Sequence, residues 1–326
     1  MKNTIVSLAA FLLLFLGSYY YFMHYSVHTP SNRELLYNEL ENKRTIYTML
    51  ILKDGEIVED HGFGKLHSND SLYEINSITK SVVSLLVGIA IEEDYIESVN
   101  QSIEEYIPEI SNYEHYEELK NITIKDLLTM RAGFAWTALE NEKSVQTNGD
   151  RLDYVLRQPM RNKPGFSFNY NSGASHLLSV IIGRATGQDI LTFAEENLFI
   201  PLEIERYHWK EQDIEGNHNG GRGLMLTPYG LGKIGQLVLQ EGEWNGVQIV
   251  PKAWIKESLK SYSHLAGGSS ITGYGYQWWL GDYKGIDYII ANGAMGQRIF
   301  IIPDLNLVIV FIADILDINS VGYIYS

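Results

Sequence analysis

The spacing of apolar residues changes along the chain, and the changes predict strand-rich ends around a helical middle. Two β-rich runs in TIYTMLILKDGEIVEDHGFG flank Asp54–Gly55, a turn pair typical of a β-hairpin. From about residue 96 to residue 229 the pattern favours helical pieces joined by long loops. Strand patterns return in YGYQWWLG, GIDYIIANGA, QRIFIIP and NLVIVFIA, and we expect turns at Gly281–Asp282 and Pro303–Asp304 to separate some of them.

Four segments carry the clearest helix signals. EINSITKSVVSLLVGIAIEE, residues 74–93, begins polar and then turns almost wholly apolar. ITIKDLLTMRAGF has Thr123 in place for an N-terminal cap, and SGASHLLSVIIGRATG ends at Gly187. TPYGLGKIGQLVL is followed by a turn at Asn245–Gly246 and a further helix. Strands and helices of this kind together predict a mixed fold.

The order of the elements predicts an α/β (α+β) fold in which both chain ends build one antiparallel sheet flanked by helices. We expect an inserted helical lobe at residues 96–234, between the two parts of an α/β lobe at residues 31–95 and 235–326. Residues 1–30 would then hold a membrane anchor or signal and a linker. A binding site is expected in the cleft between the lobes.

Composition excludes several classes of function. With 326 residues, 45% of them hydrophobic, the chain is long enough for two lobes and a large packed interior. The net charge of -15 argues against nucleic acid, whose binding needs clustered Lys and Arg, and against attraction to anionic lipid. The absence of cysteine excludes disulfides, thiolate catalysis and cysteine-ligated zinc.

The start of the chain bears on location. MKNTIVSLAAFLLLFLGSYYYFMHYS has one early lysine and then an apolar run that approaches the length needed to span a bilayer. An uncleaved anchor is favoured over a cleaved signal peptide, because no clear small-residue cleavage site follows. A buried core helix is the third interpretation. Either export interpretation places the remainder outside the cytoplasm, at the cell membrane or, after cleavage, in the secreted fraction.

The first candidate chemistry is the pair Ser77 and Lys80, which opens the apolar helix. Residues three apart lie on the same face of a helix, so the amine would lie beside the hydroxyl. Burial disfavours the ammonium form, and a neutral amine could accept the serine proton. The alternative is an exposed lysine in the first helical turn, because a lone Ser-x-x-Lys is a weak signal.

A second element is Tyr170-Asn171-Ser172, in a polar loop just before a helix. A tyrosine phenol transfers protons if nearby cations lower its pKa, and Ser172 could pass protons on by hydrogen bonding. The alternative interpretation is a packed tyrosine in a helix-capping loop, which 22 tyrosines make common.

The third element is the glycine-rich stretch IIANGAMGQRIF. Asn292 and Gly293 would let a substrate approach the backbone, and the N–H of Ala294 could join that of Ser77 in an oxyanion hole. A simple glycine-rich hairpin turn is the alternative interpretation.

The three elements occur in the order and spacing of a known set of motifs. Ser77-Ile-Thr-Lys80, Tyr170-Asn171-Ser172 and Ala291-Asn292-Gly293 resemble those of the serine beta-lactamase and penicillin-binding superfamily, with the class C branch closest. LLTMRAGF, KPGFSFNYNSG and GGRGLMLTPYGLGKIGQLVL resemble its esterase-like members, including 6-aminohexanoate-dimer hydrolase. The resemblance implies acyl transfer on Ser77, with Lys80 and Tyr170 sharing general-base and general-acid duty. It implies a small amide or ester substrate and no metal or organic cofactor.

Departures from the family pattern bear on the substrate. Ser172 replaces the common Asn of the second motif, as in the dimer-hydrolase branch, and Ala291 stands where relatives carry Lys or His. That cation normally holds the substrate carboxylate of beta-lactams, so its loss argues against efficient beta-lactamase activity unless Arg298 or Arg222 replaces it. Relatives also end in a further helix on the sheet, for which the sequence before Ser326 shows no pattern.

Other polar and aromatic residues are interpreted as structural or peripheral. His176 is expected to pack, His208 and His218 to lie near the cleft, and one ring of Trp278–Trp279 to line it. His24 and His28 lack a carboxylate that would complete a zinc site. The alternative functions are a D-Ala-D-Ala carboxypeptidase or beta-lactamase, and a penicillin-recognising sensor without turnover. The natural substrate and the oligomeric state are not predicted.

Overall fold

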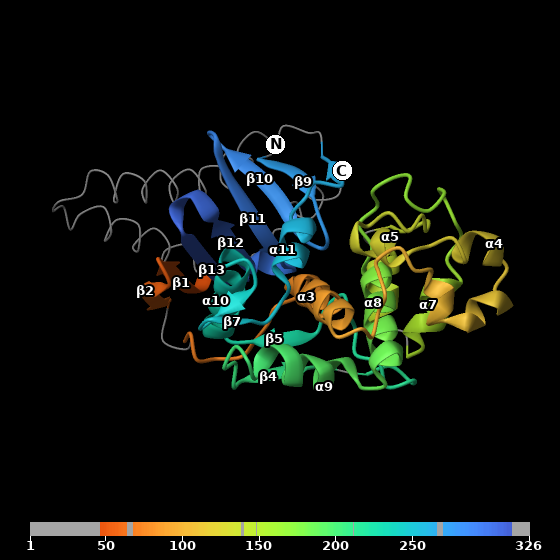
Figure 1. Ribbon diagram of the computed structural model, residues 1–326, viewed down its shortest axis with the longest axis horizontal. Coiled ribbons are helices and arrows are strands. Elements are labelled where there is room, and N and C mark those ends of the chain that lie inside the picture. Colours follow the sequence, from red (N-terminus) through yellow and green to blue (C-terminus); the bar gives the residue numbers. More distant parts are fainter. Residues whose placement is uncertain are drawn as a thin grey trace.

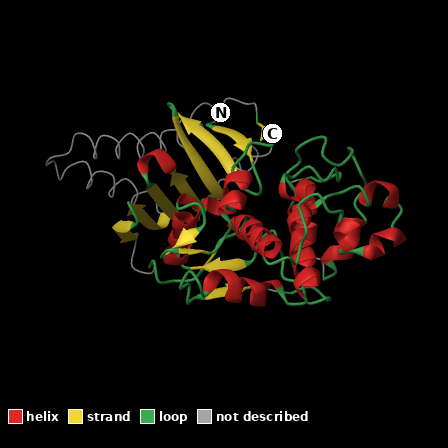
Figure 2. Ribbon diagram, in the orientation of Figure 1, coloured by secondary structure: helices red, strands yellow, loops and turns green. Residues whose placement is uncertain are grey.

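The computed structural model describes residues 46–63, 68–137, 140–147, 149–210, 212–265 and 270–314. Its main element is an eight-stranded antiparallel sheet. The sheet lies on one side of the molecule, and most helices lie on the other (Figures 1 and 2). In spatial order the strands are β2 (Glu56–Gly62), β1 (Ile46–Lys53), β13 (Leu307–Ala313), β12 (Arg298–Ile302), β11 (Ile286–Asn292), β10 (Trp279–Tyr283), β9 (Ile271–Tyr274) and β8 (Ser263–His264).

Segments from the two ends of the described chain lie side by side in the sheet. Strand β1 pairs with β13 in antiparallel register, with Leu50 opposite Val310. The predicted β1–β2 hairpin is present, and its turn residues Asp54 and Gly55 have φ values of 53° and 84°. Positive φ at both positions is what a two-residue hairpin turn requires. The predicted fold of one sheet built from both chain ends is therefore confirmed.

Helices that pack on the sheet connect it to the rest of the protein. The predicted apolar helix is α3 (Ile78–Glu92), which packs against β11, α8 (Ser172–Thr186) and α11 (Lys252–Ser258). It lies between the sheet and the helical side of the molecule (Figure 1). Helix α10 (Pro228–Leu239) packs on β1, β12 and β13. Gly235 permits this close approach, since a Cβ there would lie 2.5 Å from a methyl carbon of Val308.

The helical side consists of short pieces around α8. Thr123 caps α5 in a reciprocal box with Asp126, as predicted, but the helix ends at Leu128 because Met130 has a φ of 58°. Helix α8 ends as predicted, with Gly187 in the left-handed region. The other helical elements are η1 (Ile103–Glu105), η2 (Pro108–Asn112), α4 (Tyr116–Leu119), α5 (Ile124–Leu128), α6 (Glu140–Thr147), α7 (Arg151–Leu156), α9 (Ile190–Ala194) and η3 (Glu195–Phe199).

Short strands complete the structure around the site. A three-stranded sheet joins β3 (Tyr73–Glu74), β5 (Leu224–Leu226) and β4 (Tyr207–Trp209), and places the segment before α3 beside the chain that leads into α10. A small hairpin follows α10 with the predicted turn at Asn245–Gly246. The remaining elements are β6 (Glu243–Trp244), β7 (Val247–Gln248), η4 (Ala294–Gly296) and η5 (Pro303–Leu305).

Two details predicted for the C-terminal strands are wrong. YGYQWWLG is not one strand: β9 ends at Tyr274 and β10 begins at Trp279, because Gln277 has a φ of 64° and turns the chain. The turn expected at Gly281–Asp282 is also absent, and both residues lie within β10. The glycine is there for packing, since a Cβ would lie 2.3 Å from the ring of Tyr288. The predicted turn at Pro303–Asp304 is present as η5.

Within the described ranges, no helix combines the length and apolar character needed to cross a bilayer. The predicted anchor or signal at residues 1–30, with His24 and His28, lies outside the described residues, as does the C-terminal segment 315–326. The division into two lobes stays a prediction.

Candidate active site

Ser77 lies in the turn directly before α3 and is half-buried. The preceding residue, Asn76, has a φ of 49°, a left-handed conformation that Asn tolerates better than most residues. The Ser77 side chain does not cap the helix that it precedes. Its hydroxyl is therefore left for another partner.

That partner is Lys80, whose side chain is buried with 1% exposure. Its Nζ lies 3.1 Å from Ser77 Oγ, 2.8 Å from Ser172 Oγ and 2.7 Å from the backbone oxygen of Gly221. The lysine is thus not the exposed first-turn residue of the alternative interpretation. It is a buried amine surrounded by three oxygen atoms.

The surroundings of Lys80 make its ammonium group more acidic than that of an exposed lysine. Burial, which disfavours the ammonium form, lowers the pKa of Lys80 to about 8; the Arg222 guanidinium acts in the same direction and the Glu142 carboxylate opposes them. The three contacts also suit a neutral amine. The carbonyl of Gly221 can only accept, whereas the serine hydroxyls can accept or donate. A neutral Nζ can therefore donate to Gly221 and Ser172 while it accepts the hydroxyl proton of Ser77.

Tyr170 joins the same group of residues. Its ring centroid lies 5.0 Å from Lys80 Nζ, and the residue is buried with 6% exposure. The ring stacks on Trp279 with centroids 5.5 Å apart, and Tyr274 meets both rings edge-on. Phe168 packs behind Trp279 and Tyr274. This aromatic wall fixes the position of the phenol.

Ser172 is the first residue of α8, so its backbone N–H has no partner inside the helix. That N–H donates to Oε1 of Glu142 at 2.9 Å, and the indole N–H of Trp136 donates to the same oxygen at 2.8 Å. Sequence reasoning did not identify Glu142. It lies on the short helix α6, in a region whose acidic residues show no motif, and only its tertiary contacts reveal it.

The third motif lies beside the nucleophile turn. Gly293 approaches so closely that a Cβ there would lie 2.5 Å from the backbone oxygen of Ile75. The Asn76 side-chain amide donates to the backbone oxygen of Ala294 at 3.1 Å. Among the described residues, the N–H groups of Ser77 and Ala294 have no hydrogen-bond acceptor. Both can therefore donate to a bound ligand.

Asn292 is placed differently from its neighbours in the motif. It is buried at the end of β11, opposite Arg298 in the strand pairing. Its side-chain oxygen has no hydrogen-bond partner among the described residues. Ala291, at the position of the family's usual cation, is buried inside the same strand.

The two arginines considered as replacements for that cation are both engaged. Arg222 donates to the carboxylate of Glu74 through Nε and Nη2, and Lys210 donates to the other oxygen of Glu74 at 2.6 Å. Burial raises the pKa of Glu74, but these hydrogen bonds outweigh it and hold the pKa below its usual value. Arg298 donates to the backbone oxygens of Gly293 and Gln297.

Three of the histidines considered in the sequence lie outside the group around Lys80. His176 is fully buried, as predicted, and its Nε2 lies 3.2 Å from Asp213. The ring of His218 stacks on Trp209 and lies 3.4 Å from Asp189, while His208 is exposed on β4. No group of three potential metal ligands occurs in the described part of the chain.

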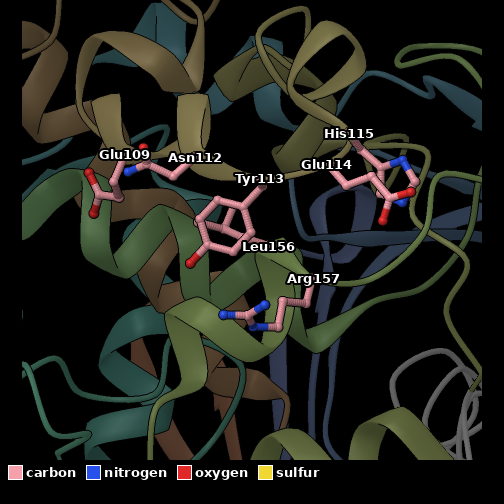
Figure 3. Close-up of a pocket in the computed structure, with 7 residues that line it drawn as sticks. All are labelled: Glu109, Asn112, Tyr113, Glu114, His115, Leu156 and Arg157. Atoms are coloured by element: carbon pink, nitrogen blue, oxygen red, sulfur yellow. The ribbon is translucent and has the colours of Figure 1, made fainter.

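A separate hollow of about 440 Å³ lies on the helical side. Its lining residues come from α7 and from the segment between η1 and α4, and include the acidic side chains Glu109 and Glu114 (Figure 3). None of the residues that line it belongs to the three motifs. It is not part of the candidate active site.

Comparison with known proteins decides the family. The sequence profile of the beta-lactamase family matches residues 42–319, which is most of the chain. This protein belongs to the beta-lactamase family. Within it, the chain is 25% identical over 289 residues to the 6-aminohexanoate-dimer hydrolase of Paenarthrobacter ureafaciens, covering 80% of this chain and 70% of that protein. The predicted resemblance is therefore confirmed.

Other relatives and solved structures agree on the fold. Protein flp of Staphylococcus aureus strain MW2 is 27% identical, and the match covers 79% of this chain but only 59% of that protein. A Bacillus anthracis protein provisionally named 6-aminohexanoate-dimer hydrolase superposes with a TM-score of 0.76 at 20% identity, covering 88% of this chain and 79% of its own. EstCE1, a hydrolase with promiscuous acyltransferase activity, superposes with a TM-score of 0.69 at 13% identity, covering 87% and 93%. At these identities the structures show the fold alone.

Proposed function

We propose that this protein is a serine hydrolase that cleaves an amide or ester bond through an acyl-enzyme on Ser77. The observation that carries the proposal is the contact between the buried Lys80 amine and the Ser77 hydroxyl, 3.1 Å apart. A base within hydrogen-bond distance of a serine hydroxyl is the arrangement that nucleophilic catalysis requires. Its support from sequence is the ordered set of three motifs, and its support from comparison is membership of a family of hydrolases.

In the first half-reaction, Ser77 Oγ attacks the substrate carbonyl carbon while its proton passes to the neutral Lys80 Nζ. The carbonyl oxygen becomes an oxyanion, for which the N–H groups of Ser77 and Ala294 are the proposed donors. The bond to the leaving group then breaks, and a proton passes to that group from Lys80 or through the phenol of Tyr170. Ser172, the first residue of α8, contacts the amine through its hydroxyl and keeps it in place for both steps.

In the second half-reaction, a water molecule attacks the acyl carbon and loses its proton to the same base system. The bond from the carbon to Ser77 Oγ breaks, and Oγ recovers a proton. The acid product leaves and the free serine is restored. Lys80 and Tyr170 share these proton transfers; the division between them stays open.

The substrate that we favour carries no carboxylate at the third motif. Ala291 offers no charge there, Arg222 is paired with Glu74, and Arg298 bonds to backbone oxygens. This favours a neutral ester or amide over beta-lactams and D-Ala-D-Ala peptides. The 6-aminohexanoate-dimer hydrolase among the relatives supports an amide or ester, without naming the substrate of this chain.

We also propose that the catalytic region acts outside the cytoplasm, behind an N-terminal membrane anchor. The support is the apolar run near the start of the sequence, preceded by a single lysine. Protease treatment of intact cells tests this, because an external region is degraded and a cytoplasmic one is not.

Covalent labelling tests the nucleophile. We expect a fluorophosphonate probe to modify the purified protein at one site, located by mass spectrometry at Ser77, and Ser77→Ala to abolish the modification. Ser179→Ala, which removes a buried serine hydroxyl bonded to the His218 carbonyl, is the matched control and should keep the labelling. Labelling that persists in Ser77→Ala contradicts the proposal.

Substrate comparison tests the reaction class. We expect steady release of product from a short-chain p-nitrophenyl ester and a much slower reaction with a chromogenic cephalosporin. A preference for the cephalosporin would favour the beta-lactamase alternative. A single burst with no further turnover would favour a penicillin-recognising sensor.

A further inference from the structure

The Glu142 carboxylate accepts from the backbone N–H of Ser172, whose hydroxyl contacts Lys80, and its charge raises the pKa of Lys80. Neither the sequence motifs nor the proposed reaction steps use it. We propose that Glu142 is a positioning residue for the base: it fixes the start of α8, whose first residue contacts Lys80, and its negative charge stabilises the ammonium form of that amine. The inference rests on the proposed function, and it adds a fourth side chain to the machinery of the same site.

Two hydrogen bonds to Glu142 hold the first residue of α8 and the neighbouring Trp136 ring in place. Oε1 of Glu142 accepts from the Ser172 N–H at 2.9 Å and from the Trp136 indole at 2.8 Å. The Trp136 ring packs so tightly on the helix that a Cβ on Gly173 would lie 2.8 Å from it. Both contacts fix the backbone of Ser172, whose Oγ lies 2.8 Å from Lys80 Nζ. A carboxylate at this helix N-terminus is also favoured by the helix dipole.

Charged groups from several elements act on Lys80. Burial disfavours its ammonium form, Glu142 favours it, and Arg222, which follows Gly221 in the chain, disfavours it. Arg222 is itself paired with Glu74, so its positive charge is partly compensated. The Lys80 Nζ also lies over the face of the Tyr170 ring, 5.0 Å from its centroid. Glu142 therefore opposes burial and the Arg222 charge, which both disfavour the ammonium form of Lys80.

This balance has a chemical consequence. When Ser77 gives up its proton, Lys80 becomes an ammonium in a buried site, and that charge must be stabilised until the leaving group takes the proton. Charge that faces a developing ion in a site of low dielectric lowers the barrier to its formation. The Glu142 carboxylate supplies this charge without contacting the substrate.

The variant Glu142→Gln separates charge from hydrogen bonding, because the amide oxygen can still accept from Ser172 and Trp136. The readout is the pH dependence of kcat/KM for p-nitrophenyl acetate and of the fluorophosphonate labelling rate. We expect the acid limb of both profiles to move to lower pH by about half a unit or more, since loss of the carboxylate favours the neutral amine. Glu140→Gln, two residues earlier on α6 and exposed, is the matched control and should leave the limb in place.

An acid limb that stays in place or moves to higher pH in Glu142→Gln overturns the inference. If that variant does not fold, Trp136→Phe and Glu142→Asp replace it. Both keep the negative charge. Both should therefore keep the acid limb of the pH profile at its wild-type position, while kcat falls. A shifted limb in either would contradict the electrostatic role. Wild-type protein that neither turns over the ester nor labels at Ser77 would instead refute the proposed function itself.

Discussion

The Asn76 side-chain amide donates a hydrogen bond to the backbone oxygen of Ala294 at 3.1 Å, and so ties the nucleophile turn to the third motif. Asn76 also has a φ of 49°, a conformation open to Asn and Gly at small cost. Two properties of one residue thus set the spacing between the Ser77 N–H and the Ala294 N–H. The proposed oxyanion hole depends on that spacing.

Replacing Asn76 by Gly should keep the backbone conformation and remove the bond. We expect kcat to fall about tenfold with a smaller change in KM, because misplaced donors weaken binding of the oxyanion more than of the substrate. Steady-state kinetics on a p-nitrophenyl ester measure both. Asn245→Gly, in an exposed turn with a φ of 50°, is the matched control and should leave both constants unchanged. Equal kinetics for the two variants would show that the bond does not position the donors.

A substitution at Gly293 also tests the contact between the nucleophile turn and the third motif. A Cβ at this position would lie 2.5 Å from the backbone oxygen of Ile75, so Gly293→Ala must push the third motif away from the nucleophile turn. We expect a loss of kcat per folded molecule of about tenfold or more, together with a lower melting temperature. Calorimetry measures the stability, and labelling at Ser77 counts the active sites.

The control for that variant is Gly281→Ala, whose Cβ would meet the ring of Tyr288 at 2.3 Å. It should destabilise the sheet by roughly 1–3 kcal/mol and leave the activity of the folded fraction unchanged. If both variants lose stability only, Gly293 serves the fold and not the site.

Lys80 determines the pH dependence that we expect for kcat/KM. Its pKa is lowered to about 8, and the proposed mechanism needs the neutral amine, so kcat/KM should rise as the pH rises through about 8. Lys80→Arg keeps a cation that does not lose its proton in this range, and we expect the rate to fall by roughly 10²–10⁴ at every pH. A profile that is flat between pH 6 and 9 would contradict a role for Lys80 as the base.

The sequence could predict those parts of the site that depend on contacts between residues close together in the chain. Ser77 and Lys80 are one helical turn apart, so a motif and a helix pattern were enough to place them together. The hairpin at Asp54–Gly55 was predictable for the same reason. Tyr170 and Ala294 were candidates from their own segments, but only the resemblance placed them with Ser77, because no local rule brings residues so distant in sequence to one point.

Other features depend on tertiary contacts and left no local signal. Glu142 is one of 40 acidic residues, and only the orphan N–H of Ser172 and the Trp136 indole distinguish it. Gly281 looked like a turn residue, but the nearby Tyr288 ring is what requires a glycine there. The engagement of Arg222 by Glu74 joins positions 148 residues apart, so the sequence could not decide whether that arginine was free.

The last prediction concerns Glu74 and substrate charge. The Glu74 carboxylate pairs with Arg222 and Lys210, and Arg222 directly follows Gly221, whose backbone oxygen lies 2.7 Å from Lys80 Nζ. Glu74→Gln removes the negative charge and leaves the Arg222 and Lys210 cations without their carboxylate partner. We therefore expect KM for a p-nitrophenyl ester with a carboxylate on its acyl chain to fall about three- to tenfold relative to a neutral ester of equal length. Glu203→Gln, which breaks the weaker surface pair with Lys233, should leave this ratio unchanged. If Glu74→Gln changes KM equally for both esters, Arg222 does not face the bound acyl group, and the preference for neutral substrates must have another cause.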